Sequence, residues 1–191
     1  HSLDRRQRQM CIRDRTKQAI STLFQVSSQN AFQVEPEFDN NNIIQYLNEL
    51  DWSQPWDSGA QYSSICVYSS TQNSYDAELL KDFSDDLVDI ETGFYFKDKI
   101  KDKRQLFNGA MKIISGLDWI NHEIHYPKKI IDFCLNNKPV FEGCDIVDYI
   151  YVLNMCSKAV NYKKGEVIKL LSELSEEMDV LYNNKVGGYS Y

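Results

Sequence analysis

Long apolar runs are missing from this 191-residue sequence, and none approaches the roughly 18–20 residues that a membrane-spanning helix needs. A basic stripe is missing as well, and the formal net charge is −7. An acidic chain without such a stripe does not suit the phosphates of nucleic acids or the surface of anionic membranes. We therefore expect no membrane span and no nucleic-acid partner.

Cysteines are few, and no two of the 5 form a Cys-x-x-Cys pair. Several of Cys66, Cys134, Cys144 and Cys156 fall on apolar stripes of predicted helices. No Asn-x-Ser/Thr sequon points to secretion. These absences favour buried free thiols in a reducing, cytoplasmic environment.

Residues 5–15 read Arg-Arg-Gln-Arg-Gln-Met-Cys-Ile-Arg-Asp-Arg, which resembles a translated sequencing adapter. We expect residues 1–15 to be an unstructured artefact fused to a metagenomic fragment, and the chain to be truncated. Residues 16–39 are then a linker or a partial first helix, and residues 40–191 are the domain. Residues 1–15 hold five Arg and two Asp, so the net charge of the remainder is about −10.

Helical periodicity dominates the rest of the chain, and no convincing alternating strand is present. Helices are predicted at about residues 41–50, 57–69, 75–88, 102–117, 127–136, 145–159 and 164–183. Cap candidates are Asp39 or Asn40 for the first, Asp57 or Ser58 for the second and Ser74 for the third. Pro127 suits a first-turn position, where its missing N–H costs nothing. The fold class is therefore all-α.

The pattern has a period. Glycine and aromatic residues punctuate the chain at Gly93-Phe94, Phe141–Gly143 and Gly187–Tyr189, roughly 48 and 46 residues apart. Each interval is predicted to hold two helices. A fixed period of this size indicates stacked antiparallel helical hairpins, which form an open solenoid or close into a ring.

Three segments carry a family resemblance: residues 89–96, residues 108–112 and the closing Gly-Gly-Tyr-Ser-Tyr191. They resemble the loop–helix repeats of the α/α toroid, the architecture of terpenoid cyclases and protein prenyltransferase β-subunits. Residues 50–61 are more similar to a bacterial branch of toroid proteins than to either enzyme group. The resemblance implies an incomplete ring, because a complete toroid needs about twelve helices.

Chemical motifs of those enzymes are not found. Asp85-Asp86-x-x-Asp89 fits the spelling of a magnesium-binding terpene synthase motif, but a solvated helix end explains it better. Glu142-Gly-Cys144 is only loosely similar to the first two zinc ligands of prenyltransferases. His122 and His125 are too close for the helical zinc-protease motif, which needs histidines at i and i+4, so we expect them in a loop. No metal and no cofactor are predicted.

Asp145 and Asp148 are the predicted catalytic pair. They lie three residues apart, and so on one face of a helix start. At the mouth of a ring they would act as general acid and base, or hold a sugar or a cation. The structural alternative is that Asp145 caps the helix and Asp148 completes a capping box.

Trp52, Trp56, Asp57, Gln61 and Asn108 are the predicted substrate-binding residues. The first four would form an aromatic wall beside hydrogen-bonding groups, suited to a sugar ring or an isoprenoid chain; the alternative is a hydrophobic staple. Asn108 precedes Gly109 inside a helix, which indicates either close helix packing or access to a ligand. Two functions stay open: an enzyme acting on a lipid-like or sugar substrate in a central cavity, or a non-catalytic helical-repeat protein that binds a small molecule, lipid or glycan.

Overall fold

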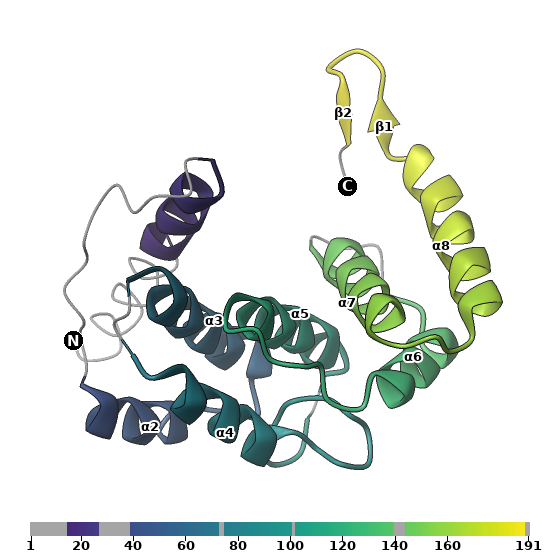
Figure 1. Cartoon of the computed structure of the whole chain (residues 1–191). Coiled ribbons are helices and arrows are strands. Elements are labelled where there is room, and N and C mark those ends of the chain that lie inside the picture. Colours follow the sequence, from purple (N-terminus) through teal and green to yellow (C-terminus); the bar gives the residue numbers. More distant parts are fainter. Residues whose placement is uncertain (1–14, 27–38, 73–74, 101, 140–143, 190–191) are drawn as a thin grey trace.

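The computed structural model describes residues 15–26, 39–72, 75–100, 102–139 and 144–189. These residues are almost entirely helical, which confirms the all-α prediction (Figure 1). Residues 15–26 form a helix. The elements that follow are α2 (Asn40–Asn48), α3 (Pro55–Gln72), α4 (Ala77–Leu87), α5 (Arg104–Trp119), α6 (Pro127–Asn136), α7 (Asp145–Ala159), α8 (Lys164–Asp179), β1 (Tyr182–Asn183) and β2 (Gly188–Tyr189).

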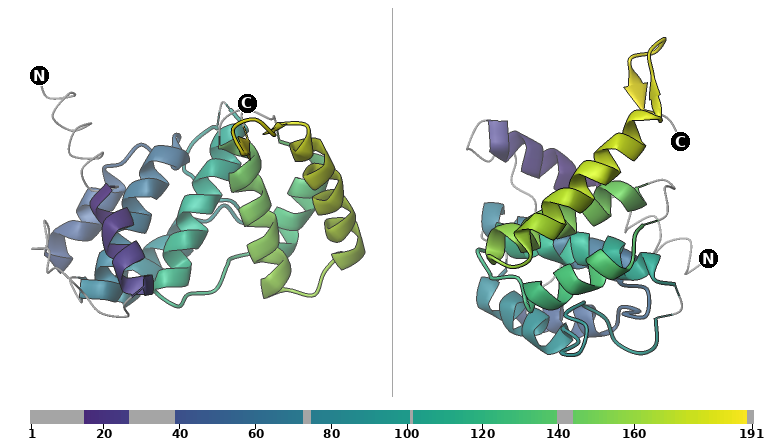
Figure 2. Two further views of the ribbon diagram at one scale, coloured as in Figure 1. Left: turned by 90° about the horizontal axis from the view of Figure 1, so that it is seen from above. Right: turned by 90° about the vertical axis from the view of Figure 1, so that its right-hand side faces the viewer.

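The helices follow an arc and alternate between two rows (Figures 1 and 2). One row holds α3, α5 and α7, and α2, α4 and α6 lie on its outer side. Contacts join α3 to α5, α5 to α7, α2 to α4 and α6 to α8. As predicted, two helices, α5 and α6, lie between the punctuation at Gly93 and that at residues 141–143, and two more, α7 and α8, lie before Gly187.

Glycines let α3 and α5 approach closely. A Cβ added at Gly109 would lie 2.7 Å from the Cβ of Pro55, and one added at Gly116 would lie 3.1 Å from the Cα of Ser63. The packing explanation for Gly109 is therefore confirmed. Residues later in α3 contact residues later in α5, so the two helices run parallel. The two helices thus occupy equivalent places in successive hairpins.

Within a hairpin the helices run antiparallel, as the pair α3–α4 shows. Near the connection the Ser69 hydroxyl donates to the Tyr75 carbonyl at 2.8 Å. Further back along α3 the Tyr62 hydroxyl donates to the Leu80 carbonyl at 2.8 Å, inside the core. The chain therefore reverses between the helices, and the antiparallel prediction is confirmed for this pair.

Helix ends follow local chemistry. The Asp39 carboxylate caps α2 by accepting from the Asn42 N–H at 2.8 Å, as predicted. For α4 the cap is Asp76, while the predicted Ser74 lies outside the described residues. The expected cap for α3 at Asp57 or Ser58 is wrong, because Pro55 already begins that helix. Pro127 does begin α6, as expected.

The chain after α8 departs from the prediction, because a helix to residue 183 was expected and α8 ends at Asp179. Residues 182–189 instead form a hairpin whose turn resembles the one after α4. The Asp89 carbonyl accepts from the Gly93 N–H at 2.8 Å, and the Asn183 carbonyl accepts from the Gly187 N–H at 2.9 Å. Both glycines have positive φ, +81° and +69°, which glycine adopts without strain. The repeated turn ends the last helix.

The helix of residues 15–26 packs against α3 and the end of α5. The Lys17 ammonium donates to the Ser63 hydroxyl at 2.8 Å. Phe24 meets Trp119 edge to face, with ring centroids 5.8 Å apart. The expectation of an unstructured segment concerned residues 1–15: Arg15 lies in this helix, and residues 1–14 are outside the described residues.

Candidate functional site

Two aspartates open α7, and both side chains are buried. Asp145 is 4% exposed and Asp148 is 3% exposed. The alternative of helix capping is wrong for both, because Cys144 occupies the N-cap position and makes no side-chain cap bond. Asp145 is then the first helical residue, and the third, where a capping-box acid belongs, is Val147 rather than Asp148. The two carboxylates face the protein interior, where a functional role remains open to them.

Residues of α5 hold the Asp145 carboxylate from one side. Asn108, itself fully buried, donates from Nδ2 to Asp145 Oδ1 at 2.9 Å. Arg104, one helical turn earlier, places its Nε 2.5 Å from Asp145 Oδ2. Because α5 and α7 are neighbours in one row, a pair spaced four residues apart on α5 reaches the first turn of α7. The structure therefore joins Asn108 and Asp145, which the sequence placed in separate candidate sites.

Asp148 has a different environment. No described residue donates a hydrogen bond to its buried Oδ2. Burial raises the pKa of Asp148 to about 6; the Lys112 ammonium opposes this shift, and the negative charge of Asp145 adds to it. The first turn of α7 thus carries one carboxylate paired with a cation and one that takes up a proton near pH 6.

A cavity of about 270 Å³ opens beside this cluster. Its lining comes from the start of α5, the segment after α6 and the start of α7: Asp102, Lys103, Arg104, Phe107, Asn108, Asn137, Lys138, Pro139 and Asp145. Asn108 Oδ1 is buried and accepts no hydrogen bond from any described residue. The cavity therefore combines charged groups of both signs with one aromatic ring, and the unsatisfied amide oxygen is buried next to it.

The remaining predicted substrate-binding residues lie elsewhere, because none of the four lines this cavity. Trp52 is buried, donates from Nε1 to the Leu47 carbonyl at 2.7 Å and contacts Phe83, so the staple alternative fits it. Trp56 is half-buried, and Asp57 is exposed. Gln61 is buried on α3 and accepts from the Tyr46 hydroxyl at 3.3 Å. The aromatic wall therefore does not belong to the cavity beside Asp145, and a separate ligand site at these residues stays a prediction.

Among the described residues, the spelling Asp85-Asp86-x-x-Asp89 does not bring its own carboxylates together as a group of three metal ligands. Asp89 Oδ1 caps its own turn, accepting from the backbone N–H groups of Glu91 at 2.9 Å and Thr92 at 2.8 Å. Glu142 lies outside the described residues. Cys66, Cys134 and Cys156 are buried free thiols, as expected, whereas Cys144 is exposed. Burial raises the pKa of Cys66 and of Cys156 to about 12, which keeps both as unreactive thiols.

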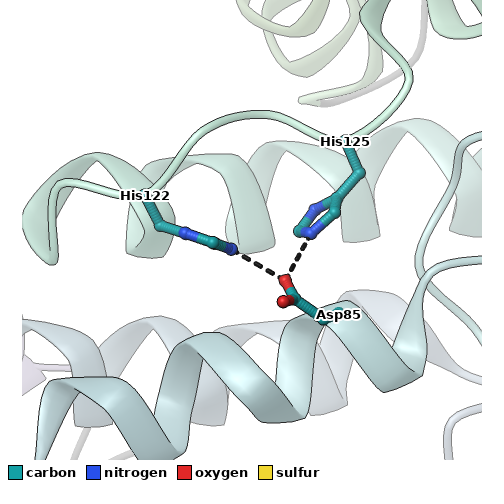
Figure 3. A group of neighbouring side chains, drawn as sticks. All are labelled: Asp85, His122 and His125. Carbon is teal, nitrogen blue, oxygen red and sulfur yellow. Dashed lines mark hydrogen bonds and ion pairs between the residues drawn. The ribbon is translucent and has the colours of Figure 1, made fainter.

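Sequence reasoning missed one constellation. His122 and His125 lie in the loop between α5 and α6, as expected, but both rings reach Asp85 on α4 (Figure 3). The only local signal is the pair of histidines three residues apart. Asp85 lies 37 and 40 residues away, where no periodicity links it to them.

Comparisons with family models, curated proteins and solved structures found no match. Among the described residues, no helix is long and apolar enough to span a membrane. Functional argument therefore rests on the geometry of the two clusters.

Proposed function

We propose that this chain is a helical-repeat protein that binds a small polyhydroxylated ligand, a sugar, in the cavity at the start of α5 and α7. The observation that carries the proposal is the lining of this cavity, where charged side chains of both signs lie beside one ring, Phe107. Sugar hydroxyls both donate and accept hydrogen bonds, so they can pair with cationic and with anionic side chains.

The size and lining of the cavity favour a sugar over an isoprenoid chain. A volume of about 270 Å³ lies just below the usual range of ligand sites, about 300–1,000 Å³, and is too small for a long isoprenoid chain. Five charged side chains line the cavity together with one ring, Phe107, and the surface that faces the cavity is mostly apolar. A sugar suits this mixture, because it supplies hydrogen bonds as well as an apolar face for the ring.

The second candidate function is catalysis, with Asp145 and Asp148 as an acid–base pair. The observation in its favour is the contrast between a carboxylate held by Arg104 and one whose pKa is raised to about 6. Two neighbouring carboxylates in different environments are typical of acid–base sites. Asp148 is not among the cavity-lining residues, however, so binding is better supported than catalysis. Membership of the α/α toroid superfamily stays a proposal, supported by the two-row hairpin array.

A binding experiment tests the proposal directly. Glucose, N-acetylglucosamine and inositol, with farnesol as the isoprenoid comparison, would be titrated into the full chain by calorimetry. We expect saturable binding of at least one sugar and none of farnesol. Asn108→Ala should abolish that binding, whereas Gln61→Ala, which removes an equally buried amide outside the cavity, should leave it unchanged.

A second variant keeps the test decisive if Asn108→Ala unfolds. Phe107→Leu retains an apolar side chain at the cavity wall but loses the flat ring, and should weaken sugar binding while the helical circular dichroism is kept. Farnesol binding with no sugar binding would favour the lipid alternative. No binding of any compound, or equal binding by all variants, would contradict the proposal.

A further inference from the structure

Three potential metal ligands meet on the outer side of the arc, away from the α5–α7 cavity. Asp85 Oδ1 lies 2.8 Å from His122 Nε2 and 2.7 Å from His125 Nε2. The three ligand atoms lie within 4.8 Å of one another. Figure 3 shows both rings, which belong to the connection between α5 and α6, turned toward the same carboxylate oxygen of Asp85 on α4.

Backbone geometry fixes His122. The C-terminus of α5 is a Schellman motif, in which the His122 N–H donates to the Leu117 carbonyl at 2.9 Å and the Asn121 N–H donates to the Asp118 carbonyl at 3.3 Å. Asn121 takes the left-handed conformation that this motif needs, with φ of 52°. The end of α5 therefore holds the backbone of His122 in a defined position.

A buried hydroxyl orients His125. Tyr95 is 1% exposed, and its hydroxyl lies 3.1 Å from His125 Nδ1 and accepts from the His125 N–H at 3.3 Å. A ligating histidine characteristically has such a partner on its other ring nitrogen, because that contact fixes the tautomer and the ring plane. The chain thus supplies a supporting contact as well as ligand atoms.

We propose that Asp85, His122 and His125 bind a Zn²⁺ ion that links α4 to the connection between α5 and α6. Two imidazole nitrogens and one carboxylate oxygen match the preference of Zn²⁺, whereas Mg²⁺ and Ca²⁺ prefer all-oxygen ligands. Ligands about 2.0–2.1 Å from a tetrahedral ion lie about 3.4 Å apart. The two hydrogen-bonded pairs need to open by only about 0.6 Å.

Binding requires a lone pair on each Nε2, so the ring proton moves to Nδ1 in both histidines. At His125 the Nδ1–H then donates to the Tyr95 oxygen. Asp85 is 51% exposed, while His122 and His125 are 22% and 16% exposed, so the ion is reachable from solvent and water completes its coordination. The ion would join two successive helical hairpins of the array.

Zinc titration of the full chain, stripped with EDTA and dialysed, tests the site. We expect one equivalent of Zn²⁺ to bind by calorimetry, to raise the Tm, and to move the Nε2 and Nδ1 resonances of His122 and His125 in a histidine ¹H–¹⁵N spectrum. Mg²⁺ at the same concentration should cause none of these three changes. Because the chain has only 3 histidines, the spectra of His122→Ala and His125→Ala assign each resonance to its residue.

Variants assign the binding to these residues. Asp85→Asn, His122→Ala and His125→Ala should each weaken Zn²⁺ binding at least tenfold, whereas Asp86→Asn, the neighbouring carboxylate, should leave it unchanged. Tyr95→Phe should weaken it about tenfold through lost orientation of the ring. Variants are compared only where their circular dichroism in EDTA matches the parent chain.

Two results would overturn the proposal. One is the absence of any Zn²⁺-dependent change in the His122 and His125 resonances at millimolar zinc. The other is zinc binding that survives Asp85→Asn and His122→Ala unchanged, which would place the ion elsewhere on the chain.

Discussion

The protein contains two carboxylate clusters that differ in almost every physical respect. Asp145 and Asp148 are buried between α5 and α7, where one is paired with Arg104 and the other has a raised pKa. Asp85 is half-exposed. Burial is the largest single influence on its pKa and raises it, but the hydrogen bonds and charges of His122 and His125 together outweigh burial and lower the pKa. Burial therefore makes the charges of the first cluster costly for stability, while exposure leaves the second cluster accessible to an ion from solvent.

Removing the cation beside the buried carboxylate should have the largest effect. Arg104→Ala leaves Asp145 as a buried charge with Asn108 as its remaining donor, and we expect a loss of about 3 kcal/mol in the free energy of unfolding. Urea denaturation measures the loss, with Lys103→Ala, an exposed neighbouring cation, as control. The double variant Arg104→Ala/Asp145→Asn should recover part of the stability. Equal losses for Arg104→Ala and Lys103→Ala would contradict the interpretation that the buried Asp145 carboxylate depends on Arg104.

The pH dependence of stability should separate Asp148 from its neighbour. A folded-state pKa of about 6, above the ordinary 3.8, means that the folded protein holds this proton more tightly than the unfolded chain. The penalty is absent below about pH 4 and complete above about pH 6, so stability falls as pH rises through that window. Asp148→Asn removes the titration. Its stability relative to the parent chain should therefore rise by about 2–3 kcal/mol between pH 4 and pH 7.

Denaturation curves recorded at pH 4, 5, 6 and 7 provide this measurement. Parallel pH profiles for the parent chain and Asp148→Asn would show that the carboxyl group titrates normally. A gain in stability accompanied by lost sugar binding would indicate that the buried acid is kept for function at a cost in stability.

The next largest loss of stability is expected at the close contact between α3 and α5. Gly109→Ala places a Cβ 2.7 Å from that of Pro55, so α5 must shift from α3 and carry Asn108 with it. We expect a loss of about 2 kcal/mol in thermal or urea unfolding. The same substitution at Gly165, where nothing lies within 4 Å, is the matched control and should be neutral or stabilising. The α3–α5 packing would be looser than described if both substitutions behaved alike.

The smallest effect is expected at the exposed cluster. In EDTA, Asp85→Asn should change the free energy of unfolding by at most about 1 kcal/mol, because solvent screens an ion pair at a half-exposed carboxylate. The low pKa of Asp85 means that this contribution is present near neutral pH and is lost as pH falls through its folded-state pKa. Asp86→Asn is the control, and a loss of several kcal/mol at Asp85 would remove the contrast between the clusters.

Much of the local structure was readable from the chain. Helical spacing of apolar residues gave the helices, and for α6 and α7 both ends were predicted as observed. The prediction of α8 ran too far, because the amphipathic pattern continues to Leu181 while the turn at Asn183–Gly187 ends the helix first. Residue 55 was missed as the start of α3, since the cap signal at Asp57 outweighed a first-turn proline.

The sequence predicted only some of the residues in the candidate sites. Asp145, Asp148 and Asn108 stood out as acids or amides at unusual helix positions, and the structure places Asn108 and Asp145 in contact. Arg104 carried no signal, because an arginine at a helix start is ordinary in isolation. Asp85 stood out only within the Asp85-Asp86-x-x-Asp89 spelling, and nothing in that spelling linked it to the histidines. Trp52 looked like a ligand wall and is a buried core residue.

Residue order by itself determined the helical content, the hairpin period and several helix ends, since these depend on side-chain spacing, capping groups and backbone preferences within a few residues. Tertiary packing decided which polar groups meet: Asp145 with Arg104 and Asn108, and Asp85 with His122 and His125. These partners lie 37 to 41 residues apart and come together only because apolar burial aligns successive hairpins side by side, which no local pattern encodes.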